Sequence, residues 1–505
     1  MAQLPPMATI LPKMRLVTLM LLLLAVCLPA ADPPRIWDDE ALKDWATPVA
    51  ALGVRPGHYS AAEYYAIPGD NLKTYPVYHP NREPKGYWEW LQKQRPEPLV
   101  DASKIRSARD WAAAGQRAFE DLDNVFFRTD DPKLIARARD PEAFKDVFLL
   151  PDGSIIGNRW VVTEKGVVLG ERECALCHVQ FTPSGTVAFG GPAGVEPAGA
   201  TDRNPAGVNL VPLAYTRFFP GDNFLVALWR SYTVPWNPDP RVEALKEKMT
   251  HPPGALFVGD PGTFARFHGS PWAQTKVPDL RGIRYSRYID ASGTHRMRGA
   301  EDLARYAAFV NGADPMTFGD HQILTPAQRK IRLRYADEVL YAIGMYLMSL
   351  DAPKNPNPAP DARSAAGQKV FQREGCISCH VPPDYTSGKL TLAQGYNPPA
   401  DHPNADDIVR LSVGTDPELA MRTRKGTGFY KIPTLRGVWT RTRLLHDGSV
   451  ASLEEMFDPA RVQPDHVPGG WKGPAGDRRG IPGHPFGLKL TPEEKAALLA
   501  FLRTL

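Results

Sequence analysis

A strongly apolar stretch near the start of the chain runs from Leu16 to Leu28. Lys13 and Arg15 precede it, and the small residues of Pro29-Ala30-Ala31 follow it. Basic residues, a short apolar core and small residues, in this order, are typical of a secretion signal. The run is short for a membrane helix, which needs about 20 residues. We therefore expect a signal peptide over residues 1–31, an exported protein and no stable membrane span; a retained anchor is the alternative.

Helical periodicity is confined to a few segments beyond the signal. Ser107 is placed to cap the first of them, which has apolar residues at three- and four-residue spacing. Thr491, Pro492 and Glu494 form a helix start near the end of the chain, because the threonine and glutamate can cap each other and proline suits the first turn. The predicted helices cover residues 107–123, 325–350, 365–374 and 491–505.

Short runs rich in valine and aromatic residues predict two β-hairpins beside the first cysteine pair. One joins residues 159–162 to 166–169, and the other joins 179–181 to 186–189 around Pro183-Ser184-Gly185. Between Ala352 and Pro360 prolines recur at short intervals, which predicts an extended linker.

The composition is that of a soluble globular protein of two or three domains. Apolar residues make up 43% of the 505 residues and charged residues 23%, with a net charge of +4. That charge is too small to favour nucleic acid as a partner. Fifty-one prolines and 42 glycines predict long loops between the regular elements.

Four of the five cysteines lie in two C-x-x-C-H motifs, Cys174 to His178 and Cys376 to His380. This spacing is the one used for covalent attachment of haem c. Residues three apart share a helix face, so both thiols can reach the vinyl groups of one porphyrin. The following histidine, His178 or His380, is placed to bind the iron as the proximal ligand. The sequence thus predicts two covalent haem c groups, held by Cys174, Cys177, Cys376 and Cys379.

Zinc and a redox disulfide are the competing interpretations of a cysteine pair. Structural zinc needs four ligands close together, whereas these motifs lie 202 residues apart. The fifth cysteine, Cys27, falls in the expected signal peptide. Export also agrees with haem, because c-type haem is attached outside the bacterial cytoplasmic membrane.

The two haem regions repeat each other at an offset of 155 residues. Lys276 to Ile283 matches Lys431 to Val438, and Tyr346 to Leu350 matches Phe501 to Leu505. A constant offset indicates duplication of a unit. We expect a mainly α fold of two cytochrome-c-like helical haem domains, with long Pro/Gly-rich loops and a few short β-hairpins. The expected parts are an N-terminal extension of unknown role (32–150), the first haem domain (151–353), a linker (354–360) and the second haem domain (361–505).

The two copies differ where the iron chemistry would be set. His446 of the second copy aligns with Ala291 of the first. Such a difference suggests that one iron is six-coordinate for electron transfer and that the other is open to a ligand.

These residues together resemble the bacterial di-haem cytochrome c peroxidase superfamily, which includes the methylamine-dehydrogenase maturation enzyme and the rubber oxygenase. The resemblance rests on both C-x-x-C-H motifs, on Lys431 to Gly437, and on Leu445 to Val450 with Leu453-Glu454-Glu455, and it covers residues 165–505. The box Gly483 to Gly487 is more similar to the rubber-oxygenase branch. The resemblance implies an active haem in the first unit and an electron-transfer haem in the second.

The distal ligand of the second haem departs from the peroxidase pattern. Peroxidases carry a methionine 14 residues after the histidine that matches His446, where this chain has Ala460. We favour His484 as the distal ligand, with His446 as the alternative, and we expect nearby Met456 to lie in the core.

The first haem has no obvious sixth ligand, and we expect an open site. His268, His295 and His321 are the remaining candidates. The tryptophan that lies between the haems in peroxidases is replaced near Phe219, unless Trp229, Trp272 or Trp439 takes its role. No acid–base catalytic residue can be assigned by name.

The expected function is peroxide reduction with electrons from a small periplasmic cytochrome c or cupredoxin. Two haems suit this reaction, because peroxide takes two electrons and such donors give one at a time. The alternatives are an oxygenase of the rubber-oxygenase kind, which would use dioxygen and an organic substrate, and an electron carrier without catalysis.

Overall fold

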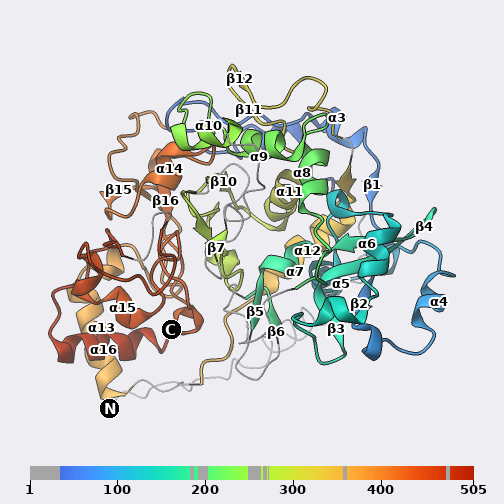
Figure 1. Cartoon of the computed structure of the whole chain (residues 1–505). Helices are drawn as coiled ribbons and strands as arrows, with labels where there is room; N and C mark the ends of the chain where they lie inside the picture. The colour runs from blue at the N-terminus through green and yellow to red at the C-terminus, as the bar shows by residue number, and fades with distance from the viewer. Residues whose placement is uncertain are drawn as a thin grey trace, which may run out of the picture.

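The structure, a computed structural model, describes residues 34–181, 187–191, 203–247, 263–264, 270, 272–331, 333–356, 361–473 and 478–505. In this part of the chain, helices joined by long loops accompany sheets of two or three strands (Figure 1). The expected signal peptide lies outside it. No helix within the described residues is both long enough and apolar enough to cross a membrane.

Helices α5 (Ala108–Asp121) and α12 (Asp337–Ser349) form the first of two crossed helix pairs. Ser107 caps α5 as predicted, since its side chain accepts a hydrogen bond from the Asp110 amide. The close crossing depends on Gly115, where an added Cβ would lie 1.8 Å from the carbonyl oxygen of Ala342. The buried face between these helices belongs to the largest core of the molecule.

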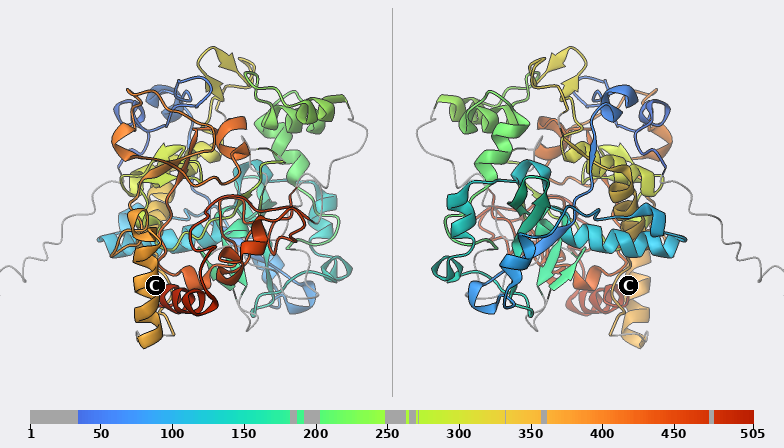
Figure 2. Two further views of the ribbon diagram at one scale, coloured as in Figure 1. Left: turned by 90° about the vertical axis from the view of Figure 1, so that its left-hand side faces the viewer. Right: turned by 90° about the vertical axis from the view of Figure 1, so that its right-hand side faces the viewer.

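Helices α13 (Ala362–Arg373) and α16 (Pro492–Leu502) form the second pair, side by side in Figure 2. They cross in the same way, because a Cβ at Gly367 would lie 1.9 Å from the carbonyl oxygen of Ala497. Thr491 and Glu494 cap each other at the start of α16, as the sequence predicts. In Figure 1 the two pairs lie on opposite sides of the molecule.

Both predicted hairpins are present. Strands β3 (Ser154–Thr163) and β4 (Gly166–Glu171) pair antiparallel, and β2 (Thr74–Tyr78) extends their sheet. Strands β5 (Val179–Phe181) and β6 (Val187–Phe189) also pair antiparallel, with their turn outside the described residues. A third sheet has the order β15-β14-β16, from Ile408–Ser412, Leu390–Leu392 and Phe429–Lys431.

Residues 34–150 pack closely on the haem-motif regions of the chain. Strand β2 pairs with β3, and β1 (Gly69–Asp70) pairs in parallel with β13 (Arg334–Tyr335). Helix α5, which also lies in this segment, faces α12 as α13 faces α16. The expected boundary at residue 150 stays a prediction, but these contacts tie α5 to the first haem motif's surroundings.

The predicted helix over residues 325–350 is wrong in its first half. Helix α12 begins only at Asp337, and residues before it form turns and strand β13. From Ile331 to Tyr335 apolar residues alternate with arginines, which is strand periodicity. Asp337 and Glu338 then suit a helix start, because acidic side chains interact favourably with the amino end of a helix.

The 155-residue offset reappears in the backbone. Asp290 and Leu445, 155 residues apart, both have φ of 61°, a left-handed conformation that is uncommon outside glycine. The turns η6 (Ile283–Tyr285) and η9 (Val438–Thr440) occupy matching positions. In each half the glycine before this turn donates a backbone hydrogen bond to the leucine just after the long helix, from Gly282 to Leu350 (3.2 Å) and from Gly437 to Leu505 (2.8 Å).

The remaining elements are short and connect the two helix pairs. The helices are α2 (Asp39–Leu42), α3 (Ala61–Tyr65), α4 (Tyr87–Leu91), α6 (Pro132–Arg137), α7 (Cys174–Cys177), α8 (Val211–Phe218), α9 (Phe224–Tyr232), α10 (Pro240–Glu247), α11 (Ala300–Val310), α14 (Glu418–Arg422) and α15 (Leu453–Met456). The strands are β7 (Thr263–Phe264), β8 (Thr275–Lys276), β9 (Tyr288–Ile289), β10 (His295–Arg296), β11 (Thr317–Phe318) and β12 (His321–Gln322).

Candidate functional site

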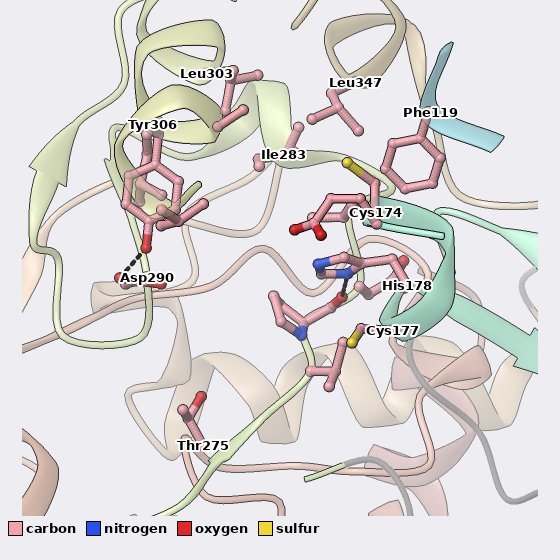
Figure 3. A pocket seen from close by; sticks show the side chains of 18 of the residues that line it. Phe119, Cys174, Cys177, His178, Thr275, Ile283, Asp290, Leu303, Tyr306 and Leu347 are labelled. Carbon is pink, nitrogen blue, oxygen red and sulfur yellow. Dashed lines mark hydrogen bonds between the residues drawn. The ribbon is translucent and has the colours of Figure 1, made fainter. Parts of the chain in front are cut away.

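The first C-x-x-C-H motif opens onto a cavity of about 450 Å³. Cys174, Cys177 and His178 all line it, and helix α7 holds the two cysteines three residues apart (Figure 3). The His178 amide donates to the Cys174 carbonyl at 3.1 Å, which continues the helical turn up to the histidine. The predicted arrangement, with both thiols and the imidazole at one cavity, is therefore present.

A backbone carbonyl orients the first histidine. Nδ1 of His178 lies 3.2 Å from the carbonyl oxygen of Pro278, which can only accept a hydrogen bond. The proton must then sit on Nδ1, and Nε2 is left with the lone pair that a metal needs. Iron-binding histidines are commonly oriented in this way.

The second motif has a cavity of its own, of about 230 Å³, lined by Cys376, Cys379 and His380. Nδ1 of His380 lies 3.1 Å from the carbonyl oxygen of Tyr385. Burial lowers the pKa of His380 to about 4, partly offset by the carbonyls of Tyr385 and Pro433. The ring is therefore neutral at pH 7, which is the form that binds a metal.

His484 lines this second cavity, as expected for a distal ligand. Its Nδ1 is buried and has no hydrogen-bond partner within the described residues. Burial, followed by the nearby His380, lowers the pKa of His484 to about 3. An unsatisfied, neutral imidazole near the proximal histidine fits a ring that faces a metal in the same cavity.

The loop that carries His484 is held in place by Arg461. This fully buried guanidinium donates to the carbonyl oxygens of Ile481 (2.7 Å), Gly483 (2.8 Å) and His484 (2.8 Å). The backbone of His484 is left-handed, with φ of 46°. Strained conformations of this kind persist where the surroundings enforce them, and they cluster at functional sites.

His446, the alternative ligand, lines the same cavity but is engaged by its neighbours. Its ring lies 4.4 Å from the Tyr430 ring, its Nε2 is 3.4 Å from the Tyr430 hydroxyl, and its Nδ1 is 3.4 Å from the Thr415 hydroxyl. Met456 is buried in the second core, where it also contributes to the cavity wall. Both histidines thus line the second cavity, and of the two His484 has the buried nitrogen without a hydrogen-bond partner in the described part of the chain.

Among the described residues that line the first cavity, His178 is the one histidine. His295 is buried against Trp45, with ring centres 4.2 Å apart, and does not reach the wall. His321 lies on strand β12 beside Trp236, and His268 falls outside the described residues. The described wall of the first cavity thus has no second histidine, and an open first site stays a prediction.

Three polar side chains that the sequence did not single out line the first cavity, and two of them, Tyr306 and Asp290, lie across it from His178 in Figure 3. Tyr306 comes from α11, Asp290 follows β9, and Lys425 follows α14. No sequence motif marks them, because three distant segments bring them together.

The two cavities adjoin, because five residues line both: Lys276, Ala291, Lys431, Pro433 and Arg441. Three of the five are cationic. Burial, with the charges of Arg441 and Lys431, lowers the pKa of Lys276 to about 7. Buried cations this close together repel one another, and an anion placed between them would stabilise their charged forms.

The charges on this shared wall can be compared with the charges that a haem carries. A haem brings two propionate carboxylates, and the shared wall offers the cations that would pair with them. Each cavity also has two thiols followed by one imidazole, the order that haem c attachment uses. The His178 ring is oriented by a carbonyl, and the His380 ring is neutral. The residues present therefore fit two haem c groups.

Four aromatic residues are the candidates for an electron relay between the haems. Of Phe219, Trp229, Trp272 and Trp439, none lines either cavity within the described residues. Phe219 and Trp229 belong instead to a separate core. Contact between the two sites runs through the cationic wall.

No disulfide joins the four motif cysteines. No group of three or more His, Cys, Asp or Glu side chains is gathered as for a metal ion anywhere in the described ranges.

Comparisons with known proteins give distant structural likenesses. No family model matches the chain, and no curated protein matches it significantly. Hydrazine synthase from Kuenenia stuttgartiensis is 14% identical, with a TM-score of 0.28 over 62% of this chain and 98% of that one. A MauG-like protein associated with microbial copper homeostasis is 18% identical (TM-score 0.29, 47% of this chain and 75% of that one). The diheme peroxidase BthA from Burkholderia thailandensis is 17% identical (TM-score 0.25, 51% and 77%). TM-scores this low carry no argument for fold or function.

Proposed function

We propose that the protein is a periplasmic di-haem c-type cytochrome that reduces peroxide with electrons from a small redox protein. The observation that carries the proposal is the asymmetry of two adjoining C-x-x-C-H cavities. The second has a spare buried imidazole, His484, near its proximal histidine, whereas the described wall of the first has none. One site is thus suited to a six-coordinate iron and the other to an iron that binds a small ligand.

In this proposal each haem is held by its own motif. Cys174 and Cys177 bind the first haem and His178 its iron; Cys376, Cys379, His380 and His484 do the same for the second. Haem supplies the redox chemistry, and the protein supplies ligation, burial and orientation. We also propose that the two helix pairs and their motifs arose by duplication, which the matched backbone conformations at the 155-residue offset support.

The two motifs differ in solvent exposure, which supports different roles for the two proposed haems. Ala175 in the first motif and Val179 just after it are fully buried, whereas the matching Ile377 and Val381 at the second motif are 36% and 40% exposed. The second haem's attachment loop therefore offers an apolar surface at the outside of the molecule. We propose that a small cytochrome c or cupredoxin delivers electrons there, and that they cross the shared wall to the first haem.

Electron paramagnetic resonance of the holoprotein tests the proposal first. We expect one high-spin and one low-spin ferric haem, and catalytic oxidation of a reduced donor when peroxide is added. His484→Ala should convert the low-spin signal to high-spin, because the second iron loses its distal ligand. His446→Ala is the matched control, and it should keep the low-spin signal.

Other outcomes would decide between the alternatives. Two low-spin haems, before and after half-reduction, together with no peroxide turnover, would leave an electron carrier. A high-spin haem that does not turn over peroxide but consumes dioxygen with an organic substrate would favour the oxygenase. Loss of the low-spin signal in His446→Ala and its retention in His484→Ala would reverse the ligand assignment.

A further inference from the structure

The wall of the first cavity carries a hydrogen-bonded polar cluster of Asp290, Tyr306 and Lys425. The Tyr306 hydroxyl donates to Oδ2 of Asp290, as Figure 3 shows. Nζ of Lys425 lies 2.6 Å from the same oxygen and 2.9 Å from the Tyr306 hydroxyl. In Figure 3, Tyr306 and Asp290 lie across the cavity from Cys174 and His178.

The cluster is costly to build, and a buried ion pair of this kind is weak evidence for a stabilising role. Lys425 and Tyr306 are buried, and Asp290 is nearly so. Burying a charged pair removes both ions from water, and the attraction between them repays this cost only in part. Apolar side chains of similar size would often serve the fold equally well.

The second haem unit has the same backbone turn without an acid, although in the first unit Asp290 Oδ2 also accepts a hydrogen bond from the Thr294 hydroxyl (3.1 Å). Leu445 occupies the position equivalent to Asp290, with the same φ of 61°, and it lines the second cavity. The same backbone conformation thus places a leucine at the second cavity, which also contains His484. At the first cavity, which has no second histidine among its described lining residues, it places a carboxylate. The carboxylate is therefore specific to the first cavity.

We propose that Asp290 is the acid–base catalytic residue at the open face of the first haem, and that Tyr306 and Lys425 position it. The inference rests on the proposed function. Asp290 takes the proton from the inner oxygen of hydrogen peroxide and returns it to the outer oxygen, which leaves as water when the O–O bond breaks. The inner oxygen becomes the second water with two protons from solvent and two electrons from the donor protein. The Lys425 ammonium and the Tyr306 hydroxyl hold the Asp290 carboxylate in position through their bonds to its Oδ2.

The experiment uses the holoprotein and two readouts. Asp290→Asn removes the base and keeps the shape, because asparagine tolerates the left-handed backbone. We expect kcat/KM for peroxide to fall about 100-fold or more, the range for losing a general acid–base group. Cyanide reports on the same face without turnover, because hydrogen cyanide must lose a proton to bind iron as the anion. Its rate of binding to the ferric first haem should fall about tenfold or more in Asp290→Asn.

Tyr306→Phe and Lys425→Gln extend the test if Asp290→Asn fails to fold. Both leave the carboxylate in place and loosen it, so smaller decreases in the same two rates are expected. Tyr288→Phe is the matched control. It removes a buried tyrosine–aspartate hydrogen bond of 2.8 Å, to Asp407, that lines neither cavity, and both rates should stay at the wild-type value.

The outcomes separate this inference from the proposed function. Wild-type protein that reduces no peroxide, yet binds cyanide faster than Asp290→Asn, would reject the peroxidase and keep the assignment of Asp290. Variants that bind cyanide at the wild-type rate would overturn the assignment, even if peroxide turnover is real. Absence of cyanide binding to the wild-type first haem would also overturn it, because the face would then not be open.

Discussion

His58 illustrates, at the scale of one residue, how burial without a partner makes stability depend on pH. Its ring packs 5.2 Å from Trp45 and 5.7 Å from Phe309, and its Nε2 is buried without a hydrogen bond from the described residues. This burial lowers the pKa of His58 to about 4 from an ordinary value of 6.5. Below pH 6.5 the His58 imidazole therefore becomes protonated in the unfolded chain but stays neutral in the folded one until the pH approaches 4.

The consequence is a loss of stability on acidification that His58→Leu should reduce. The contribution of His58 is complete above pH 6.5 and is lost as the pH falls toward 4, and it amounts to about 3 kcal/mol. Guanidinium unfolding of the holoprotein at pH 7 and pH 4.5 measures the difference. From pH 7 to pH 4.5, the free energy of unfolding should fall more for the wild-type protein than for His58→Leu. Equal losses would show that the ring protonates without penalty.

At this scale the sequence predicted the residues that form local motifs. C-x-x-C-H is contiguous, so Cys174, Cys177 and His178 could be identified as one group, and the structure places them at one cavity. His484 was favoured from its position before the closing helix, and it does line the second cavity. The cluster of Asp290, Tyr306 and Lys425 could not be predicted, because its members contact each other only through the tertiary fold.

At the scale of elements, two glycines set the distance between the paired helices. Gly367→Ala should lower the stability of the protein by about 2–3 kcal/mol, because its Cβ would collide with the Ala497 backbone, which cannot move aside without separating α13 and α16. Thermal unfolding monitored at the haem absorbance measures this. Gly115→Ala should have a similar effect at α5 and α12.

Gln368→Ala is the control for this pair of variants. It lies next to Gly367 on the exposed side of α13, and such surface changes usually stay within about 0.5 kcal/mol. A Gly367→Ala variant as stable as Gln368→Ala would show that the helices have room to adjust. Perturbation of only the nearer haem by each glycine variant would agree with two units built alike.

Elements were predicted well where a cap or a hairpin marked them locally. Ser107 and Thr491 identified the starts of α5 and α16, and valine-rich runs identified β3 with β4. The chain from residue 325 to 336 was predicted as the first half of a helix, with Ile331 among its apolar positions. Arg334 and Tyr335 instead pair with β1, a partner more than 260 residues away, which no local pattern reveals.

At the scale of the whole molecule, the exposed second motif can be tested as the surface that receives electrons. Ile377→Glu with Val381→Glu should raise KM for the reduced donor about tenfold, because the charges disrupt an apolar contact. KM for peroxide should not change. Steady-state kinetics with varied donor and fixed peroxide measure the difference.

Val54→Glu with Val467→Glu is the matched control for that surface, since these valines are 38% and 45% exposed elsewhere on the molecule. This control should keep the wild-type KM for the donor. An equal increase in both double variants would mean that the donor responds to overall charge. No increase in either would mean that electrons arrive at another surface.

The wall common to both cavities has a thermodynamic consequence. Lys276, Lys431 and Arg441 line both cavities, so in the proposed di-haem protein their charges would stabilise added electrons at either haem. An electron placed on one haem would partly neutralise this field and make the second electron harder to add. The two midpoint potentials would then be properties of the pair, and a redox titration of either haem would depend on the oxidation state of its neighbour.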